Sequence, residues 1–325
     1  MRLRRRGLLG AALSGLGPAA RLRAAEPAWP VRPITLVVAY PPGAITDTVG
    51  RRVAERLGAR LGVSVVVENR GGAGGNLAAA HVARQRGDDH TLLFTSYGNL
   101  IIAAAADLKL DFHPWRDLAP VAMVGPMTVV LLVRPDLPAM DLRGFLAHAA
   151  ANPGRVNFAS VGVGSSYHLL IEQLQAYGGL SLTHVPYRGG AAAMTDLLGG
   201  RVDATLATVL FARPYVADGR ARAIAVANAE RSPVLPDLPT VGEAVPGAVL
   251  TDGLAVFGPA TLPAPTILQA NAALREVVMA PAMRDWLTGE GVTPRAGPPE
   301  ALSAEVQGAE AGLRRLLAEA RIRLE

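Results

Sequence analysis

Short apolar runs rich in β-branched residues alternate with helix-period segments along most of this chain. Residues 34–39 (ITLVVA) form such a run, and a helical pattern with Thr46 or Asp47 as its N-cap continues to residue 61. Continuous apolar runs are typical of strands buried on both faces, as in parallel sheets. The order strand, helix, strand therefore predicts parallel strands joined by right-handed helical crossovers.

This alternation occurs in two sets, which predicts two lobes. The first set has strands at residues 34–39, 63–67 and 91–95 and helices at 46–61 and 76–86. The second has strands at 129–133, 156–159, 182–185, 202–207 and 223–227, and helices at 142–151, 166–177 and 191–198. Helical patterns at 266–279, 283–290 and 299–321 have no strands of their own, so we expect them to cover the first lobe. Lobe I is then residues 26–125 and 228–325, lobe II is 126–227, and more than one crossing between them would make a hinged clamshell.

The N-terminus has the pattern of an export signal. Arg4, Arg5 and Arg6 precede a short apolar stretch at residues 7–20, and the small residues Ala24 and Ala25 offer a cleavage site. Fourteen apolar residues are too few to span roughly 30 Å of hydrocarbon as a helix. We expect residues 1–25 to be a signal peptide, of either the Sec or the twin-arginine type, and the mature protein to be soluble in the periplasm.

The charge of the chain argues against a polyanionic partner. The formal net charge is +5, but six arginines lie before Glu26 with no acid among them. Without them the chain has 26 basic and 27 acidic residues, from totals of 32 and 27. A nucleic acid partner is therefore not expected. The chain also has no cysteine, which excludes disulfides, thiolate metal sites and a lipid-modified cysteine.

Three glycine-rich turns each connect a predicted strand to a predicted helix, at residues 41–47 (PPGAITD), 69–76 (NRGGAGGN) and 162–166 (GVGSS). Ligands of open α/β sheets bind outside the carboxyl ends of the strands, where all three turns lie. A helix N-terminus presents unpaired amides and a partial positive charge, so it holds an anion without a basic side chain. Turns from both lobes facing one crevice would suit a small acid with two ends.

No pattern indicates catalysis, a metal or a cofactor. The only lysine is Lys109, so no glycine-rich turn is a phosphate-binding loop. The six histidines show no pair at helical spacing, which argues against a histidine metal site. Ser165 or Ser166 with His168 suggests a hydrolase at first sight, but the G-x-S-x-G pattern and a spaced aspartate are missing.

Short segments of the chain, in order, match the pattern of one known family: WPVRPI at 29–34, YPPG at 40–43, TD at 46–47, VENR at 67–70, GAGGN at 72–76, NFAS at 157–160, GSSxHL at 164–169, HVPYRG at 184–189, GGRVD at 199–203 and RSP at 231–233 with LPT at 238–240. From about Trp29 to its C-terminus the chain thereby resembles the substrate-binding receptors of tripartite tricarboxylate transporters, the Bordetella uptake gene (Bug) family. The resemblance implies a two-lobed α/β periplasmic-binding-protein (flytrap) fold. It also implies a receptor that captures a small carboxylate, such as a di- or tricarboxylate or an aromatic acid, and delivers it to the membrane permease subunits of a tripartite transporter.

Carried onto this chain, the resemblance assigns ligand contacts to the three turns and their surroundings. The assigned residues are Pro42, Gly43, Ala44, Thr46, Asp47, Gly74, Gly75, Asn76, Ser96, Gly164, Ser165 and Ser166. His168, Tyr187 and Asp203 are further candidates, although a structural hydrogen bond, lobe packing and a turn are open alternatives for these three. Asp47 has the alternative role of helix cap. No catalytic residue, cofactor or metal is expected, and a monomer is the default.

The sequence departs from the family pattern at the first turn, where Ala44 replaces a glycine and Ile45 follows. A methyl group and a β-branched side chain there would narrow the pocket or change which carboxylate fits, and Ile45 slightly favours a less polar acid. Ala207 and Thr208 stand where the family often has an aspartate or asparagine, which disfavours a ligand with an amino group. The family's tryptophan before Phe257 is also missing. Two other functions stay open: a sensory receptor that docks on a membrane signalling protein, and an enzyme on the same scaffold.

Overall fold

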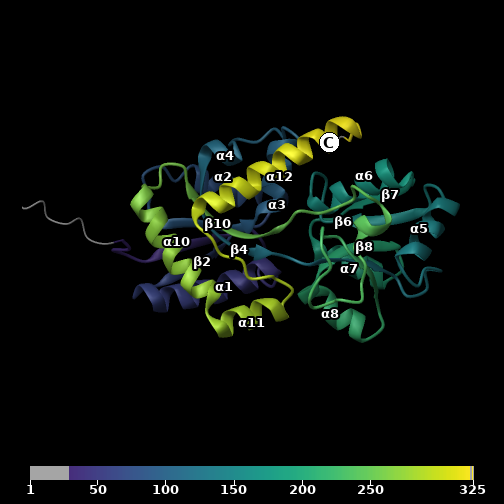
Figure 1. Cartoon of the computed structure of the whole chain (residues 1–325), viewed down its shortest axis with the longest axis horizontal. Helices are drawn as coiled ribbons and strands as arrows, with labels where there is room; N and C mark the ends of the chain where they lie inside the picture. Colours follow the sequence, from purple (N-terminus) through teal and green to yellow (C-terminus); the bar gives the residue numbers. More distant parts are fainter. Residues whose placement is uncertain (1–28, 323, 325) are drawn as a thin grey trace, which may run out of the picture.

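The computed structural model describes residues 29–322 and residue 324, and it has two α/β lobes side by side (Figure 1). The expected signal peptide at residues 1–25 lies outside the described residues. Each lobe is built on a five-stranded mixed sheet with helices on its faces. The expectation of a two-lobed α/β fold is confirmed.

The first sheet has the strand order β2-β1-β3-β10-β4. β1, β2 and β3 are parallel, whereas β10 runs antiparallel to both of its neighbours. The strands are β1 (Ile34–Val38), β2 (Val65–Asn69), β3 (Thr91–Ser96), β4 (Leu118–Pro126) and β10 (Gly253–Pro259). Because the three parallel strands end at one edge, the turns that follow them are brought together there.

Helices from both ends of the chain cover the first sheet. α1 (Ile45–Leu61), α10 (Ala264–Met279) and α11 (Pro281–Gly289) share one apolar core with it. On the other face lie α2 (Asn76–Ala83), α3 (Tyr97–Ala105) and α12 (Pro299–Glu319). Two short helices complete the lobe, η1 (Ala73–Gly75) and α4 (Pro114–Asp117).

The second sheet repeats this arrangement, with the strand order β7-β6-β8-β5-β9. β6, β7 and β8 are parallel, and β5 is antiparallel to both of its neighbours. The strands are β5 (Val129–Val133), β6 (Val156–Ser160), β7 (Leu182–Pro186), β8 (Ala204–Thr208) and β9 (Arg222–Val226). The helices are α5 (Leu142–Ala151), α6 (Ser166–Gly178), α7 (Gly190–Leu198), α8 (Val209–Ala217) and α9 (Val241–Ala244).

The proline-rich segment after β9 packs on the second lobe. Val241, Val245 and Leu250 are buried in the core that also contains α5 and α6. α9 begins with a capping box between Thr240 and Glu243, which fixes its start. The chain therefore returns to the first lobe near residue 251. The sequence analysis had placed this boundary at residue 228. The reason is that apolar side chains between the prolines continue the second core.

Two chain crossings connect the lobes and lie next to each other. β4 leads into β5 through Met127 and Thr128, and the returning chain enters β10 through Asp252. The Met127 amide donates to the Asp252 carbonyl at 3.1 Å. Asn228 accepts from the Val129 amide at 2.9 Å and donates to the Met127 carbonyl at 2.7 Å. Paired crossings of this kind restrict the lobes to a hinge motion.

None of the described helices combines the length and the apolar character needed to cross a membrane.

Gly125, at the end of β4 beside the crossing, offers a test of this hinge geometry. It has φ +154°, and a Cβ placed there would lie 1.9 Å from the Thr293 carbonyl oxygen. We predict that Gly125→Ala lowers the free energy of unfolding by about 3 kcal/mol or more, since it combines backbone strain with a clash against main chain.

The matched control is Gly62→Ala, at φ +70° with no atom within 4 Å of the new Cβ. It should cost only about 1–2 kcal/mol, the ordinary cost of left-handed backbone. Urea denaturation of both variants measures this, and equal losses would contradict the tight packing at the crossing.

Candidate ligand-binding site

The turns after the parallel strands of both lobes meet around the side chain of Asn99, in the first turns of α3. Asn99 Nδ2 donates to the Gly74 carbonyl at 2.9 Å and to Tyr40 Oη at 2.5 Å. Its Oδ1 accepts from the Ser166 amide, at the start of α6 in the second lobe, at 3.2 Å. One buried amide side chain thus joins the first two turns of lobe I to the helix start of lobe II.

The first turn is held in shape by Asp47, which is 4% exposed. Its carboxylate accepts from the Gly43 amide at 3.0 Å and from Asn69 Nδ2 at 2.8 Å, and it pairs with Arg51 at 2.9 Å. Burial raises the pKa of Asp47, but the Arg51, Gly43 and Asn69 hydrogen bonds outweigh it and hold the pKa below its usual value. Asp47 therefore shapes the turn and leaves no free oxygen for a ligand.

The first helix of the site leaves its amino end free of side-chain capping. Its N-cap is Ala44, whose methyl group cannot accept an amide hydrogen. Pro42 and Gly43 are exposed beside it, and Thr46 is buried in the first turn. Ile45 packs into the core of the first lobe instead of lining the site. The expectation that Ile45 narrows the pocket does not hold, because the helix turns its side chain towards the sheet.

The second turn brings its backbone close to the first lobe's core. Gly74 and Gly75 have positive φ angles of 63° and 94°, which glycine adopts without strain. A Cβ on Gly75 would lie 3.2 Å from Ala39 Cβ. Asn76 then begins α2, and its Oδ1 is buried without a hydrogen-bond partner. The Nδ2 group of the same side chain, and not this oxygen, is the atom that can donate to an incoming carboxylate.

The third turn, in the second lobe, is stabilised by hydrogen bonds from its own side chains. Ser165 caps α6 by accepting from the His168 amide at 3.2 Å, and it donates to the Gly162 carbonyl at 2.6 Å. The Gly164 amide donates to His168 Nδ1 at 3.2 Å. Ser165 and His168 hold the loop through these bonds, and both are buried, as is Ser166.

Two histidines stack beneath this loop, with ring centroids 4.0 Å apart. His184 Nε2 lies 2.6 Å from Ser160 Oγ, which in turn accepts from the Gly162 amide at 3.1 Å. Burial, and then the nearby His168, lower the pKa of His184 to about 4. His184 is therefore a neutral support for the loop near pH 7.

Three further residues from the sequence analysis have other tasks. Ser96 Oγ donates to Asp252 Oδ1 at 2.5 Å, an interaction inside the protein. Tyr187 follows β7 at the correct edge, but its hydroxyl donates to Asp196 on α7 at 2.7 Å. Asp203 precedes β8, at the amino ends of the strands, where it pairs with Arg134 at 2.8 Å. Asp203 is therefore at the opposite edge of the sheet from the candidate site.

Sequence reasoning missed Tyr40, Asn99 and Asp252. Tyr40 directly precedes the first turn, and a large aromatic side chain at that position could have been predicted to lie near the site. Asn99 and Asp252 lie in segments with no glycine-rich pattern, one inside α3 and one at a crossing. Only the tertiary structure brings them to the three turns.

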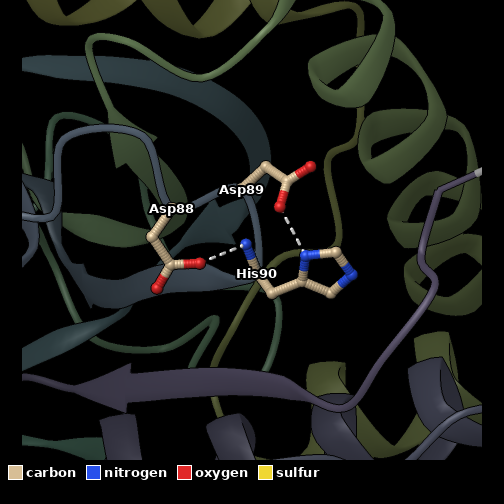
Figure 2. A group of neighbouring side chains, drawn as sticks. All are labelled: Asp88, Asp89 and His90. Carbon is tan, nitrogen blue, oxygen red and sulfur yellow. Dashed lines mark hydrogen bonds and ion pairs between the residues drawn. The ribbon is translucent and has the colours of Figure 1, made fainter.

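A cluster of Asp88, Asp89 and His90 has the donor types of a metal site, but its atoms are already engaged (Figure 2). Asp89 Oδ1 lies 2.5 Å from His90 Nδ1, and Asp88 accepts from the His90 amide at 2.9 Å. His90 Nε2 accepts from the Val31 amide at 3.1 Å. The cluster precedes β3, away from the three turns, and anchors the segment that begins at Trp29.

A family model described as "Tripartite tricarboxylate transporter family receptor" matches residues 49–318 of the chain. The chain belongs to this receptor family. The family and the structures that resemble the chain are solute-binding proteins and not enzymes. The resemblance inferred from the turns is thereby confirmed.

Solved structures of this kind superpose along nearly the whole chain. Rpa4515 of R. palustris with adipate has a TM-score of 0.84 and 29% identity, covering 91% of this chain and 99% of that one. MatC from Rhodopseudomonas palustris with bound malate has a TM-score of 0.81 and 32% identity, covering 89% and 100%. The periplasmic binding protein BugD has a TM-score of 0.81 and 28% identity, covering 91% and 99%.

The low pKa of His184 predicts a pH dependence of receptor stability. Because the pKa of His184 is lower in the folded protein than the ordinary value near 6.5, the unfolded chain binds more protons between these values. Stability contributed by neutral His184 is therefore present above about pH 6.5 and is lost as the pH falls towards 4.

His184→Gln retains a hydrogen-bonding side chain beside Ser160 and does not titrate. We expect the difference in unfolding midpoint between the native receptor and this variant to shrink as the pH falls from 7 to 4. Thermal unfolding at unit pH steps measures it. A difference that stays constant with pH would show that His184 does not titrate in this window.

Proposed function

We propose that this receptor captures a small carboxylate between its lobes and delivers it to the membrane permease subunits of a tripartite tricarboxylate transporter. The observation that carries the proposal is that Asn99 bonds to Gly74 in the second turn, to Ser166 at the end of the third turn and to Tyr40 just before the first turn. The lobes would act as the two halves of a monomeric periplasmic receptor. Membership of the receptor family supports this location and partner.

The first carboxylate of the ligand would bind at the amino ends of α1 and α2. The N-caps of these helices, Ala44 and Gly75, have no side-chain acceptor for the first-turn amides. The exposed backbone at Pro42 and Gly43 leaves room for an oxygen to approach, and Asn76 Nδ2, at the start of α2, supplies a further donor. Two helix N-termini suit an anionic group such as a carboxylate.

The other end of the ligand would meet the second lobe at Gly164 and Ser166. This loop is built in advance by Ser165, His168 and His184, so little ordering is needed on binding. A ligand touching both lobes favours the closed form only through contacts that the open form lacks. The permease would then recognise the closed receptor.

Two solved structures similar to this chain support a dicarboxylate as the ligand class. One contains adipate and one malate, both small dicarboxylates. Because the Ile45 side chain is buried in the core, it does not make the first turn more apolar, and the turn presents mainly backbone groups to a ligand. A small, flexible dicarboxylate is therefore our leading ligand class.

The direct test is thermal unfolding of the protein without residues 1–25, after removal of co-purified ligand, against a panel that includes malate, adipate, citrate and aromatic acids. A ligand at about 100 times its dissociation constant adds about 2.7 kcal/mol to folded stability, which raises the midpoint by about 5 °C. A selective rise with one acid supports the proposal, and the absence of any rise contradicts it.

Asn76→Ala tests the site itself. We expect the best acid of the panel to bind about tenfold more weakly, the loss of one hydrogen bond to a charged group. The unfolding midpoint without ligand should change little, because Asn76 Oδ1 has no partner to lose. Asn152→Ala, in the second lobe at the end of α5, is the control; it should leave affinity unchanged.

A further inference from the structure

The end of α12 makes an apolar contact between the lobes that is separate from the two chain crossings. α12 runs along the first lobe towards α6 of the second lobe (Figure 1). Its last turns and the residues after it share a cluster of buried side chains with α3 and α6. The members of this cluster are Ile102, Ala105, Leu169, Leu317 and Leu324. Leu169 is the member that belongs to the second lobe, so the cluster joins the lobes through side chains.

The chain turns back on itself directly after α12. Arg321 has a positive φ of 54°. Its amide donates to the Ala318 carbonyl at 3.3 Å, and the next amide, of Ile322, donates to the Leu317 carbonyl at 3.0 Å. These are the two bonds of a Schellman motif, which folds the following residues back onto the last turn of a helix. The left-handed backbone is unfavourable for arginine, so packing beyond the turn has to hold it in place.

That packing is provided by Leu324, which is 4% exposed although it lies beyond the last helix. We call Arg321, Ile322 and Leu324 the C-terminal hook. The hook reaches the third turn of the candidate site. A Cβ placed on Gly164 would lie 3.8 Å from the Leu324 carbonyl oxygen and 3.5 Å from Leu108 Cδ1. These are ordinary van der Waals distances, so a ligand loop of lobe II packs against residues of lobe I.

Arg314 fixes the end of α12 to the end of α3. Its guanidinium pairs with Asp107 at 2.7 Å and donates to the Ala104 carbonyl at 2.6 Å. The start of α3 carries Asn99, whose Oδ1 accepts from the Ser166 amide of lobe II at 3.2 Å. Both ends of α3 thus contact the second lobe, one through a hydrogen bond and one through the apolar cluster. Separating the lobes would expose the apolar surface of the cluster to water, which is unfavourable.

We propose that the C-terminal hook is a latch that holds the third turn of lobe II against lobe I, and so favours the closed form of the ligand-free receptor. The driving force is the burial of Leu324 and Leu169 in one cluster. Burying a single leucine side chain shifts such an equilibrium by roughly tenfold or more. A ligand then has less of the closure to supply from its own contacts. The inference concerns the ligand-free protein, so it can fail while the proposed function holds.

The test is the distance between two spin labels in the receptor, measured by double electron–electron resonance after removal of co-purified ligand. The chain has no cysteine, so Met140→Cys and Leu268→Cys supply two unique and exposed label sites. Met140 precedes α5 and Leu268 lies in α10, and these helices are at opposite ends of the molecule (Figure 1). Opening of the lobes lengthens this distance. We expect Leu324→Ala to raise the ratio of long-distance to short-distance molecules about tenfold.

Leu302→Ala is the matched control, since it removes a buried leucine from the same helix, in a core made of lobe I residues. It should leave the distance distribution unchanged. The native distribution in Leu324→Ala would overturn the proposal, because the hook would then not hold the lobes. An equal shift in both variants would indicate general destabilisation and would overturn it as well.

Leu169→Ala tests the same contact from the second lobe and leaves the hook intact. We expect a shift like that of Leu324→Ala. The double variant should add little to either single change, because both changes remove one shared contact. Shifts that add in full would show that the two leucines act separately, and would contradict the latch.

Discussion

Helices that follow parallel strands all direct their amino ends to one edge of the sheet, and in this receptor both lobes turn that edge towards each other. The partial positive charges at these ends favour an acceptor group or an anion as their partner. At α3 the partner is Asp252, which the protein carries itself. At α1 and α2 the N-caps are Ala44 and Gly75, which provide no acceptor. The positions of the glycine turns, the hinge and the ligand site all depend on this arrangement of helix ends.

The two lobes differ in how they prepare for a ligand. The first lobe leaves backbone amides and the Asn76 side chain open, on turns fixed by Asp47 and Asn69. The second lobe presents a loop whose conformation is already fixed by hydroxyl hydrogen bonds and a stacked histidine pair. A rigid loop that closes on an open site needs little reorganisation, which favours binding of a small acid. Asn99 connects the two halves, since its side chain bonds to both.

The sequence was sufficient for elements with a clear period and for turns rich in glycine. The alternation of apolar runs and helices predicted both sheets, and the ends of α1, α5 and α6 lie within a residue or two of the predicted ranges. β4 and β10 were missed because their apolar stretches are interrupted by glycine and proline. Contacts between lobes were beyond sequence patterns. Asp47, Ser165 and His168 have the chemistry of ligand contacts, but packing turns them inward, and Asp252 and Asn99 acquire their roles only through the fold.

The central claim is that a small acid joins the lobes by binding between them. Small-angle X-ray scattering of the protein without residues 1–25, titrated with the acid of highest affinity, tests it most directly. Our account predicts that the radius of gyration falls as the site fills, along the same curve as binding measured by calorimetry. Binding at full stoichiometry with no change in the radius of gyration would contradict it.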